Sequence, residues 1–201
     1  MEKERQMQEM TRVMADFVSY IARKLPDDVE AKLQELAADE KNPLAKTIYD
    51  TMKTNQDLAM DLKRPSCQDT GVLQYWVKCG ANFPLIGELE AVLREATYVA
   101  TQEAPLRHNC VETFDEYNTG KNIGTNAPYL LWEIVPDRDD VEIFPYMAGG
   151  GCSLPGSGKT LMPGEGYEGV AKFVLDLMTS YGLNACPPLL IGVGVATSID
   201  T

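Results

Sequence analysis

Positive charge, long apolar runs and histidine are all scarce in this chain of 201 residues. Lysine and arginine total 18 against 30 aspartate and glutamate residues, and the net charge of −12 argues against binding nucleic acid or an anionic membrane surface. No apolar stretch approaches the ~20 residues that a membrane-spanning helix needs. The charged start, MEKERQMQEM, lacks the apolar core of a signal peptide. We therefore expect a cytoplasmic protein.

The cysteines form an odd-numbered set without the spacing of a small disulfide scaffold: Cys67, Cys79, Cys110, Cys152 and Cys186. In a reducing compartment such a set points to metal ligation, catalysis or simple burial. The hydrophobic content of 44% fits an ordinary globular protein with a sizeable core. Because the negative field would repel an anionic substrate, local cations, some of them from a partner, must capture any such ligand.

Helical spacing of apolar residues predicts that roughly the first sixty residues are helical. A first helix is expected over about residues 2–24 and ends before Pro26. Asp27 is expected to cap a second helix, and Asn42 with Pro43 to start a third. The chain therefore begins with a helical region.

The remainder predicts interleaved strands and helices. Strand-favouring residues occupy 72–78, a helix is expected over 88–103, and strands over 129–135 and 141–146 flank PDRDD, which favours a β-hairpin or adjacent strands. Pro145 indicates a sheet edge or the end of a strand. A helix over about 165–181, stopped by Gly182, precedes a final apolar strand from Leu189. The predicted class is α/β (mixed), an N-terminal helical region followed by a mixed β-sheet flanked by helices.

The segment RPSCQDTG, residues 64–71, places a thiol, a carboxamide and a carboxylate on the consecutive residues Cys67, Gln68 and Asp69. One loop can thus offer a soft metal ligand, a hydrogen-bonding amide and a proton-transfer group to the same small ligand. Cys186, in the turn-forming segment NACPP, is a second candidate ligand. The alternatives are cysteines buried as small hydrophobes and a turn-capping aspartate.

Two further segments suggest anion binding. Arg107 and His108 form a cationic pair in APLRHNC, where the arginine fork matches a carboxylate, although the chain's one histidine is equally consistent with a structural role. The run Gly149–Gly151 lets backbone amides approach an anion, or else serves a tight crossing. In contrast, GSGKT at 156–160 has Ser153 where a nucleotide-binding loop requires glycine, so ATP or GTP binding is rejected.

Together, the segments RPSCQDTG, APLRHNCVE, FDEYNTGKN, DDVEIFPYMAGGGCSLPG and NACPPLLIGVGVATS resemble the class I, iron–sulfur-dependent fumarase and tartrate dehydratase family. The resemblance runs from about Pro26 onward, and GGGCSLPG with RHN favours the tartrate branch. It implies a 4Fe-4S hydro-lyase in which Cys67 and Cys186 are two of three cluster ligands. The family's third cysteine would lie beyond Thr201, so we expect a C-terminally incomplete form of one catalytic domain, helical over 1–63 and sheet-containing over 64–201.

The resemblance also implies that Gln68, Asp69, Arg107 and Gly150 line the substrate pocket beside an open iron. That iron would act as a Lewis acid on a 2-hydroxy dicarboxylate, while Asp69 transfers a proton, Gln68 orients the substrate and Arg107 binds its carboxylate. The expected reaction dehydrates L(+)-tartrate to oxaloacetate. It would require a beta subunit, in an alpha2beta2 heterotetramer.

Three alternatives stay open at this point. Fumarate–malate hydration would use the same cluster and a substrate that differs by one hydroxyl. A cluster-free, non-catalytic fragment or assembly subunit would account for the missing third cysteine. A structural zinc site would combine Cys67, Cys186 and His108.

Overall fold

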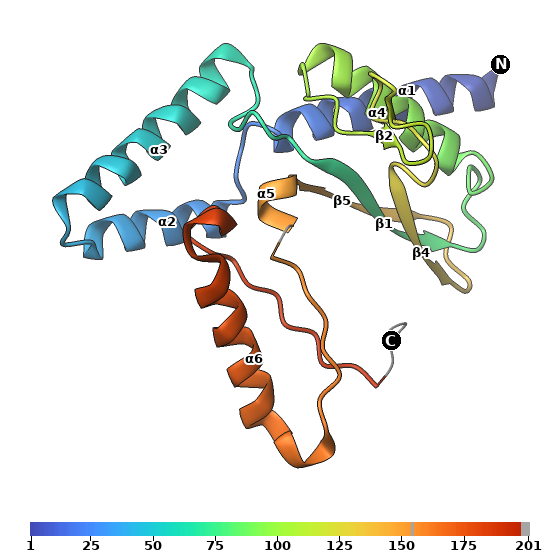
Figure 1. The fold of residues 1–201 in the computed structure, drawn as a ribbon. Helices are drawn as coiled ribbons and strands as arrows, with labels where there is room; N and C mark the ends of the chain where they lie inside the picture. Colours follow the sequence, from blue (N-terminus) through green and yellow to red (C-terminus); the bar gives the residue numbers. More distant parts are fainter. Residues whose placement is uncertain (154, 198–201) are drawn as a thin grey trace. The chain divides into compact units, whose positions relative to one another are not determined.

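The computed structural model of the chain describes residues 1–153 and 155–197, apart from the side chain of Leu183. The chain divides into two compact units, Met1–Ala148 and Gly149–Thr201. The first unit holds a three-stranded mixed sheet preceded and interrupted by helices, which confirms the α/β (mixed) class and the helical N-terminal region (Figure 1). Among the described residues, no helix combines the length and the apolar content that a bilayer span requires.

Strand β1 (Val72–Gly80) is the centre of the sheet, whose strand order is β4-β1-β5. Strand β4 (Tyr129–Val135) runs parallel to β1, and β5 (Val141–Ala148) runs antiparallel to it. The predicted hairpin or adjacent pairing of β4 and β5 is therefore wrong, because β1 lies between them. The expectation that Pro145 marks a sheet edge is confirmed, since β5 is an outer strand.

The connection between β4 and β5 crosses the end of β1 at Gly80. The backbone N–H of Gly80 donates to the carbonyl of Asp140 at 2.9 Å, and the N–H of Asn82 donates to the carbonyl of Arg138 at 2.9 Å. A β-carbon on Gly80 would lie 2.3 Å from the carbonyl oxygen of Arg138, so only glycine allows the crossing. Turn-forming residues predict a change of direction but not the strand that the chain passes on the way.

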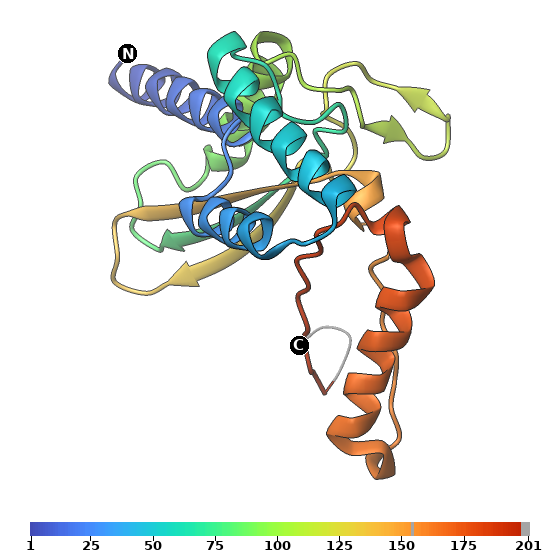
Figure 2. The same ribbon diagram turned by 90° about the vertical axis from the view of Figure 1, so that its left-hand side faces the viewer.

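Helices α1 (Glu2–Ile21) and α4 (Leu89–Glu103) pack against each other on one face of the sheet (Figures 1 and 2). The strand β1 alternates between buried and more exposed residues, as a half-covered strand does. The core combines its inward side chains with the facing sides of the two helices: Met14, Ala15, Val18, Leu73, Tyr75, Val77, Cys79, Leu89, Leu93, Ala96 and Ala100.

Helices α2 (Asp27–Asp39) and α3 (Pro43–Leu62) form a V within the first unit (Figure 1). Asn42 caps α3 as predicted, because its side chain accepts a hydrogen bond from the N–H of Leu44 at 2.9 Å. Asp27 is not the cap of α2. It is the first residue of that helix, and Pro26 occupies the capping position without a side-chain hydrogen bond.

The start of β1 lies next to loops that carry several of the residues predicted for the site. Val72 pairs with Ala148, the last residue of β5, and Gln74 pairs with Tyr129, the first residue of β4. The loop before β1, the loop before β4 and the end of β5 therefore lie at the same end of the sheet. The glycine run follows Ala148 directly in the chain.

The second unit contains α5 (Gly150–Ser153), a 3-10 turn η1 (Pro163–Glu165), helix α6 (Gly166–Tyr181) and a further 3-10 turn η2 (Gly182–Ala185). The predicted helix and its stop are confirmed, since Gly182 follows α6 with φ +49°. The predicted final strand is wrong over its described residues, 189–197, which are not in a strand and leave Leu190 91% exposed. A strand needs a neighbour for its backbone hydrogen bonds, which an apolar sequence alone does not provide.

Candidate functional site

The loop that carries Cys67 is anchored at the residue before it. The N–H of Ser66 donates to the carbonyl of Ala22, just after α1, at 2.9 Å. The side-chain amide of Asn55, on α3, donates to the carbonyl of Ser66 at 2.6 Å. The chain therefore enters the loop from a fixed point between two helices.

Within the loop, exposure falls along four consecutive residues. Cys67 and Gln68 are exposed, Asp69 is half-buried and Thr70 is buried. The Sγ atom of Cys67 lies 3.6 Å from Oε1 of Gln68. The thiol and the carboxamide thus face solvent together, while the carboxylate turns toward the body of the unit.

Gly71 closes the loop against the sheet. Its φ of +88° lies in a region that side chains with a β-carbon rarely adopt. A β-carbon at this position would also lie 2.5 Å from the carbonyl carbon of Ala148. Glycine is thus required twice, by backbone conformation and by the close approach of β5.

The second predicted segment, around Arg107, lies beside this loop. The hydroxyl of Thr70 accepts a hydrogen bond from the N–H of Arg107 at 2.9 Å. The side-chain amide of Asn109 donates to Oδ1 of Asp69 at 3.1 Å. These two bonds place Asp69 and Arg107, which are 38 positions apart in the sequence, in adjacent loops. The Arg107 side chain is exposed.

Asn122 holds the Arg107 loop from its buried side. Only 4% of Asn122 is exposed, and its φ of +54° is one that asparagine tolerates better than most residues. Its Oδ1 accepts from the N–H groups of Asn109 (2.7 Å) and Cys110 (3.4 Å). Its Nδ2 donates to the carbonyl of Arg107 (2.9 Å) and to the hydroxyl of Thr101 (3.1 Å). The side chain therefore ties the loop to α4.

A buried chain of hydroxyl groups continues this network into the core. Thr101 donates to the carbonyl of Thr97 at 2.7 Å, and the Thr97 hydroxyl lies 2.9 Å from the hydroxyl of Tyr75 on β1. Burial raises the pKa of Tyr75 to about 12. These hydroxyl groups thus connect the central strand, α4 and the loop. Because each buried polar group in the network has a hydrogen-bond partner, the network is more rigid than one with unpaired groups would be.

In the second unit, Cys186 faces the glycine run. Cys186 has φ +55° and ψ +62°, a left-handed conformation that costs a residue with a β-carbon roughly 1–2 kcal/mol. A β-carbon on Gly151 would lie 3.2 Å from its Sγ atom, which is closer than normal van der Waals contact. The glycine run therefore leaves room beside this thiol. Gly150, the predicted substrate-binding residue, begins α5 next to it.

The five cysteines, all reduced, fall into two groups. Cys79 and Cys110 are buried, and burial raises the pKa of each thiol. Cys67, Cys152 and Cys186 are exposed. Taken unit by unit, the described residues bring no three side chains of histidine, cysteine, aspartate or glutamate into a metal-binding group.

A 4Fe-4S cluster is held by cysteine thiolates, and Cys67 in the first unit and Cys186 in the second each offer an exposed thiol of that kind. Both thiols are exposed, and the one at Cys186 has a space beside it that a β-carbon on Gly151 would fill. The buried pair Cys79 and Cys110 does not fit, since each belongs to the packed interior.

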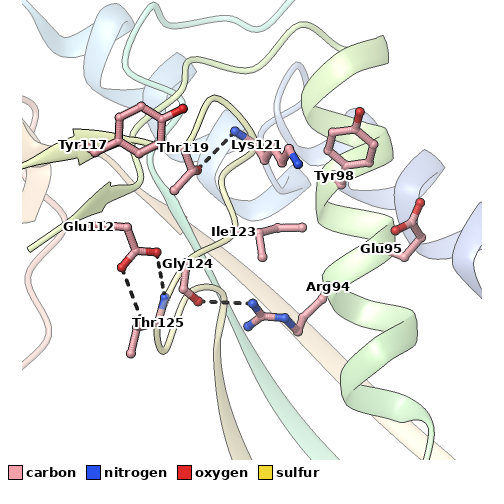
Figure 3. Close-up of a pocket in the computed structure, with 10 residues that line it drawn as sticks. All are labelled: Arg94, Glu95, Tyr98, Glu112, Tyr117, Thr119, Lys121, Ile123, Gly124 and Thr125. Carbon is pink, nitrogen blue, oxygen red and sulfur yellow. Dashed lines mark hydrogen bonds between the residues drawn. The ribbon is translucent and has the colours of Figure 1, made fainter. Parts of the chain in front are cut away.

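An open hollow of about 780 Å³ lies elsewhere in the first unit, between α4 and the segment 112–125 (Figure 3). Its charged groups hold this segment in place. The guanidinium of Arg94 donates to the carbonyls of Ala127 and Gly124, both at 3.2 Å, and Glu112 accepts from the hydroxyl of Thr125 at 3.3 Å. None of the residues predicted for the site lines this hollow. We therefore assign it a structural role.

The residues that hold the Cys67 and Arg107 loops in place were not predicted from the sequence: Thr70, Gly71, Asn109 and Asn122. Each stands inside a segment on which the resemblance rests, so the signal was present, but the segments carried no information about which side chains touch. His108 is exposed, and its carbonyl accepts from the side chain of Asn118 at 2.7 Å.

The model of the family described as fumarate hydratase (Fumerase) matches residues 11–201, and the chain belongs to this family. The chain is 52% identical over 199 residues to L(+)-tartrate dehydratase subunit alpha of Escherichia coli (strain K12), an alignment that covers 99% of the chain and 66% of that relative. A second relative of the same name, from Escherichia coli O157:H7, is 53% identical with the same coverage. A Methanocaldococcus jannaschii relative is 30% identical over 191 residues, which is 94% of the chain and 67% of that protein. The chain thus spans slightly less than two thirds of the length of the Escherichia coli relatives.

Proposed function

We propose that this chain is the cluster-binding part of an alpha-type subunit of a hydro-lyase, and that its substrate is L(+)-tartrate. One observation carries the proposal: the Cys67–Asp69 loop and the Arg107 loop lie side by side, joined by the Thr70 and Asn109 hydrogen bonds. This arrangement puts a thiol, a carboxamide, a carboxylate and a guanidinium at one end of the sheet. The names of the relatives support the substrate and the subunit type.

In this proposal Cys67 and Cys186 hold a 4Fe-4S cluster together with a third cysteine. None of the other cysteines in this sequence is assigned as that third ligand. When bound, such a cluster supplies Lewis-acid chemistry toward a hydroxyl group. The room beside the thiol of Cys186 and the exposure of both thiols support this assignment. Cys152 is exposed as well, but the resemblance gives it no ligand role.

The other residues act on the substrate. Arg107 binds one carboxylate of the dicarboxylate by two parallel hydrogen bonds, which offsets the repulsion from a chain of net charge −12. Gln68 orients the substrate through its amide, and the backbone of Gly150 approaches the same anion. Asp69 exchanges a proton with the substrate, a contribution worth roughly 10²–10⁴-fold in rate.

The overall reaction removes the elements of water from L(+)-tartrate. A proton leaves one carbinol carbon, hydroxide leaves the other and takes up a proton, and the enol that forms rearranges to oxaloacetate. A beta subunit would supply the residue that takes the proton from carbon. An alpha2beta2 heterotetramer is the proposed assembly.

Fumarate hydration is the second candidate, and the description of the matching family favours it. Fumarate and malate carry the same two carboxylates as tartrate, so Arg107 and Gln68 would serve either reaction. The difference lies in one hydroxyl group, which can change discrimination strongly when the site hydrogen-bonds it.

The test uses anaerobically prepared protein assembled with its beta subunit. We expect about four iron and four sulfide per alpha-type subunit, turnover of L(+)-tartrate above that of L-malate, and loss of activity in air. Preference for malate would support the second candidate, whereas absence of iron and sulfide would support a cluster-free role. Zinc in place of iron would support a structural zinc site.

Substitutions separate the roles in the same preparation. Cys67→Ser and Cys186→Ser should each abolish the cluster, whereas the matched control Cys152→Ser should retain it. Asp69→Asn should keep the cluster spectrum and lose turnover by roughly 10²-fold or more. Loss of the cluster in Asp69→Asn would show that Asp69 is structural.

A further inference from the structure

Asn109 donates two hydrogen bonds, one from its backbone and one from its side chain. Its backbone N–H donates to Oδ1 of Asn122 at 2.7 Å, and its side-chain Nδ2 donates to Oδ1 of Asp69 at 3.1 Å. The first bond fixes the backbone position of Asn109, and the second fixes the end of its side chain against Asp69. A single residue therefore joins the Asp69 carboxylate to the loop that carries Arg107.

The anchor for Asn109 is itself rigid. Asn122 is 96% buried by difference from its exposed fraction of 4%, and its amide also bonds the hydroxyl of Thr101 on α4 at 3.1 Å. Thr101 is 1% exposed and belongs to the hydroxyl chain that reaches Tyr75. Because each of these groups has its hydrogen-bonding partner inside the core, displacement of the anchor would leave buried polar atoms unsatisfied.

We propose that Asn109 is a positioning residue that sets the orientation of the Asp69 carboxylate for proton transfer. The proposal rests on the proposed function, in which Asp69 exchanges a proton with the substrate. The terminal torsion of an aspartate has a broad energy profile, so its carboxylate plane is not fixed by the side chain itself. An amide N–H held from the core fixes that plane through one oxygen.

The chemistry of the contact gives a discriminating substitution. Asn109→Asp keeps the size and shape of the side chain but replaces the donating NH₂ group by an acceptor oxygen. It therefore removes the hydrogen bond and brings a second carboxylate beside Asp69. Asn109→Ala removes the contact without adding charge. Asn118→Ala is the matched control, because Asn118 bonds the carbonyl of His108 in the same loop, at 2.7 Å, without that contact to Asp69.

The experiment measures kcat and KM for L(+)-tartrate in the anaerobic holoenzyme, together with iron content. For Asn109→Asp and Asn109→Ala we expect kcat to fall by roughly 10–100-fold, as a misoriented catalytic group does, with KM and iron content close to wild type. Asn118→Ala should retain wild-type kcat. An unchanged kcat in Asn109→Asp would overturn the proposal, as would a loss of activity that only follows a loss of iron.

A second measurement does not depend on turnover. Thermal unfolding of wild type, Asp69→Asn, Asn109→Ala and the double variant tests whether the two side chains are coupled. We expect the two losses in melting temperature to be less than additive, because either substitution removes the same hydrogen bond. Additive losses would show that the contact carries no energy and would overturn the proposal.

The two measurements separate failure of the inference from failure of the proposed function. A wild-type holoenzyme that converts neither tartrate nor malate would overturn the function and the positioning role of Asn109, while coupling in the unfolding data would still support the Asp69–Asn109 contact. An active wild type with normal kcat in both Asn109 variants would overturn the positioning role alone.

Discussion

A β-carbon added to Gly151 would lie 3.2 Å from the Sγ atom of Cys186. Two features of the second unit act on the same thiol: Gly151 has no side chain, and the backbone of Cys186 has a strained, left-handed conformation. One leaves space next to the thiol, and the other directs the chain so that the thiol faces that space. Strain of this kind is typical of functional positions in proteins.

Gly151→Ala should therefore weaken binding of the proposed cluster without unfolding the second unit. The added methyl group forces the thiol of Cys186 to move by a few tenths of an ångström. We expect iron to be lost to a chelator on the order of ten times faster than from wild type, as disturbances around metal ligands typically produce. Gly158→Ala is the control, since a β-carbon there meets open space. Equal rates for the two variants would contradict the prediction.

Alkylation should distinguish the two groups of cysteines. In the cluster-free protein at neutral pH, iodoacetamide should modify Cys67, Cys152 and Cys186, which are exposed. Cys79 and Cys110 should react only after unfolding, because burial blocks access and raises the pKa of both thiols. Loading of the proposed cluster should then protect Cys67 and Cys186 but leave Cys152 reactive. Peptide mass spectrometry reads out each site, and protection of Cys152 would argue for a different ligand set.

Gly71→Ala should destabilise the first unit and disrupt the candidate site. Its positive φ alone costs an alanine roughly 1–2 kcal/mol, and the contact with the backbone of Ala148 adds to this cost. We expect the free energy of unfolding to fall by about 2 kcal/mol or more. Urea denaturation measures the loss. Gly87→Ala, where a β-carbon meets nothing within 4 Å, should be close to wild type, and a similar loss there would contradict the explanation.

Alkaline pH should destabilise the protein through Tyr75. Below pH ~10 the phenol is protonated in both the folded and the unfolded state. From about pH 10 to the folded-state pKa of about 12, the unfolded state releases this proton and the folded state keeps it, so stability falls as pH rises. The loss should be on the order of 2–3 kcal/mol.

Tyr75→Phe should remove this part of the pH dependence, at the cost of about 1 kcal/mol from the lost hydrogen bond to Thr97. Tyr129→Phe is the control, because Tyr129 is 53% exposed. Denaturation curves at pH 9 to 12 compare the three proteins. A Tyr75→Phe variant as steeply pH-dependent as wild type would contradict the assignment.

Local patterns in the sequence predicted the elements well. The helical spacing at the N-terminus, the Asn42 cap and the Gly182 stop are all confirmed, because each depends on residues within a few positions of one another. The pairing of β4 and β5 was wrong because strand order depends on contacts between distant segments. Nothing in PDRDD indicates that β1 lies between its two neighbours.

The candidate site shows the same division. The chemical groups of the consecutive residues Cys67, Gln68 and Asp69 indicate a functional site from the sequence alone. The residues that support them do not, since Asn109 bonds Asp69 and Asn122 in turn holds Asn109, through contacts between positions far apart in the chain. Asparagine in a loop is ordinary, and only the fold distinguishes one that holds a carboxylate from one that faces water.

Strand β1 is bounded by two glycines that each admit a neighbouring backbone. Gly71 admits Ala148 at one end, and Gly80 admits Arg138 at the other. The length of the strand therefore fixes the distance between the Cys67 loop and the crossing of residues 136–140. Insertion or deletion of a single residue between these glycines would slip the register and reverse which side chains face the core. We expect length variation in this fold to be tolerated in the turn between β2 (Val111–Glu112) and β3 (Tyr117–Asn118) far more readily than in its central strand.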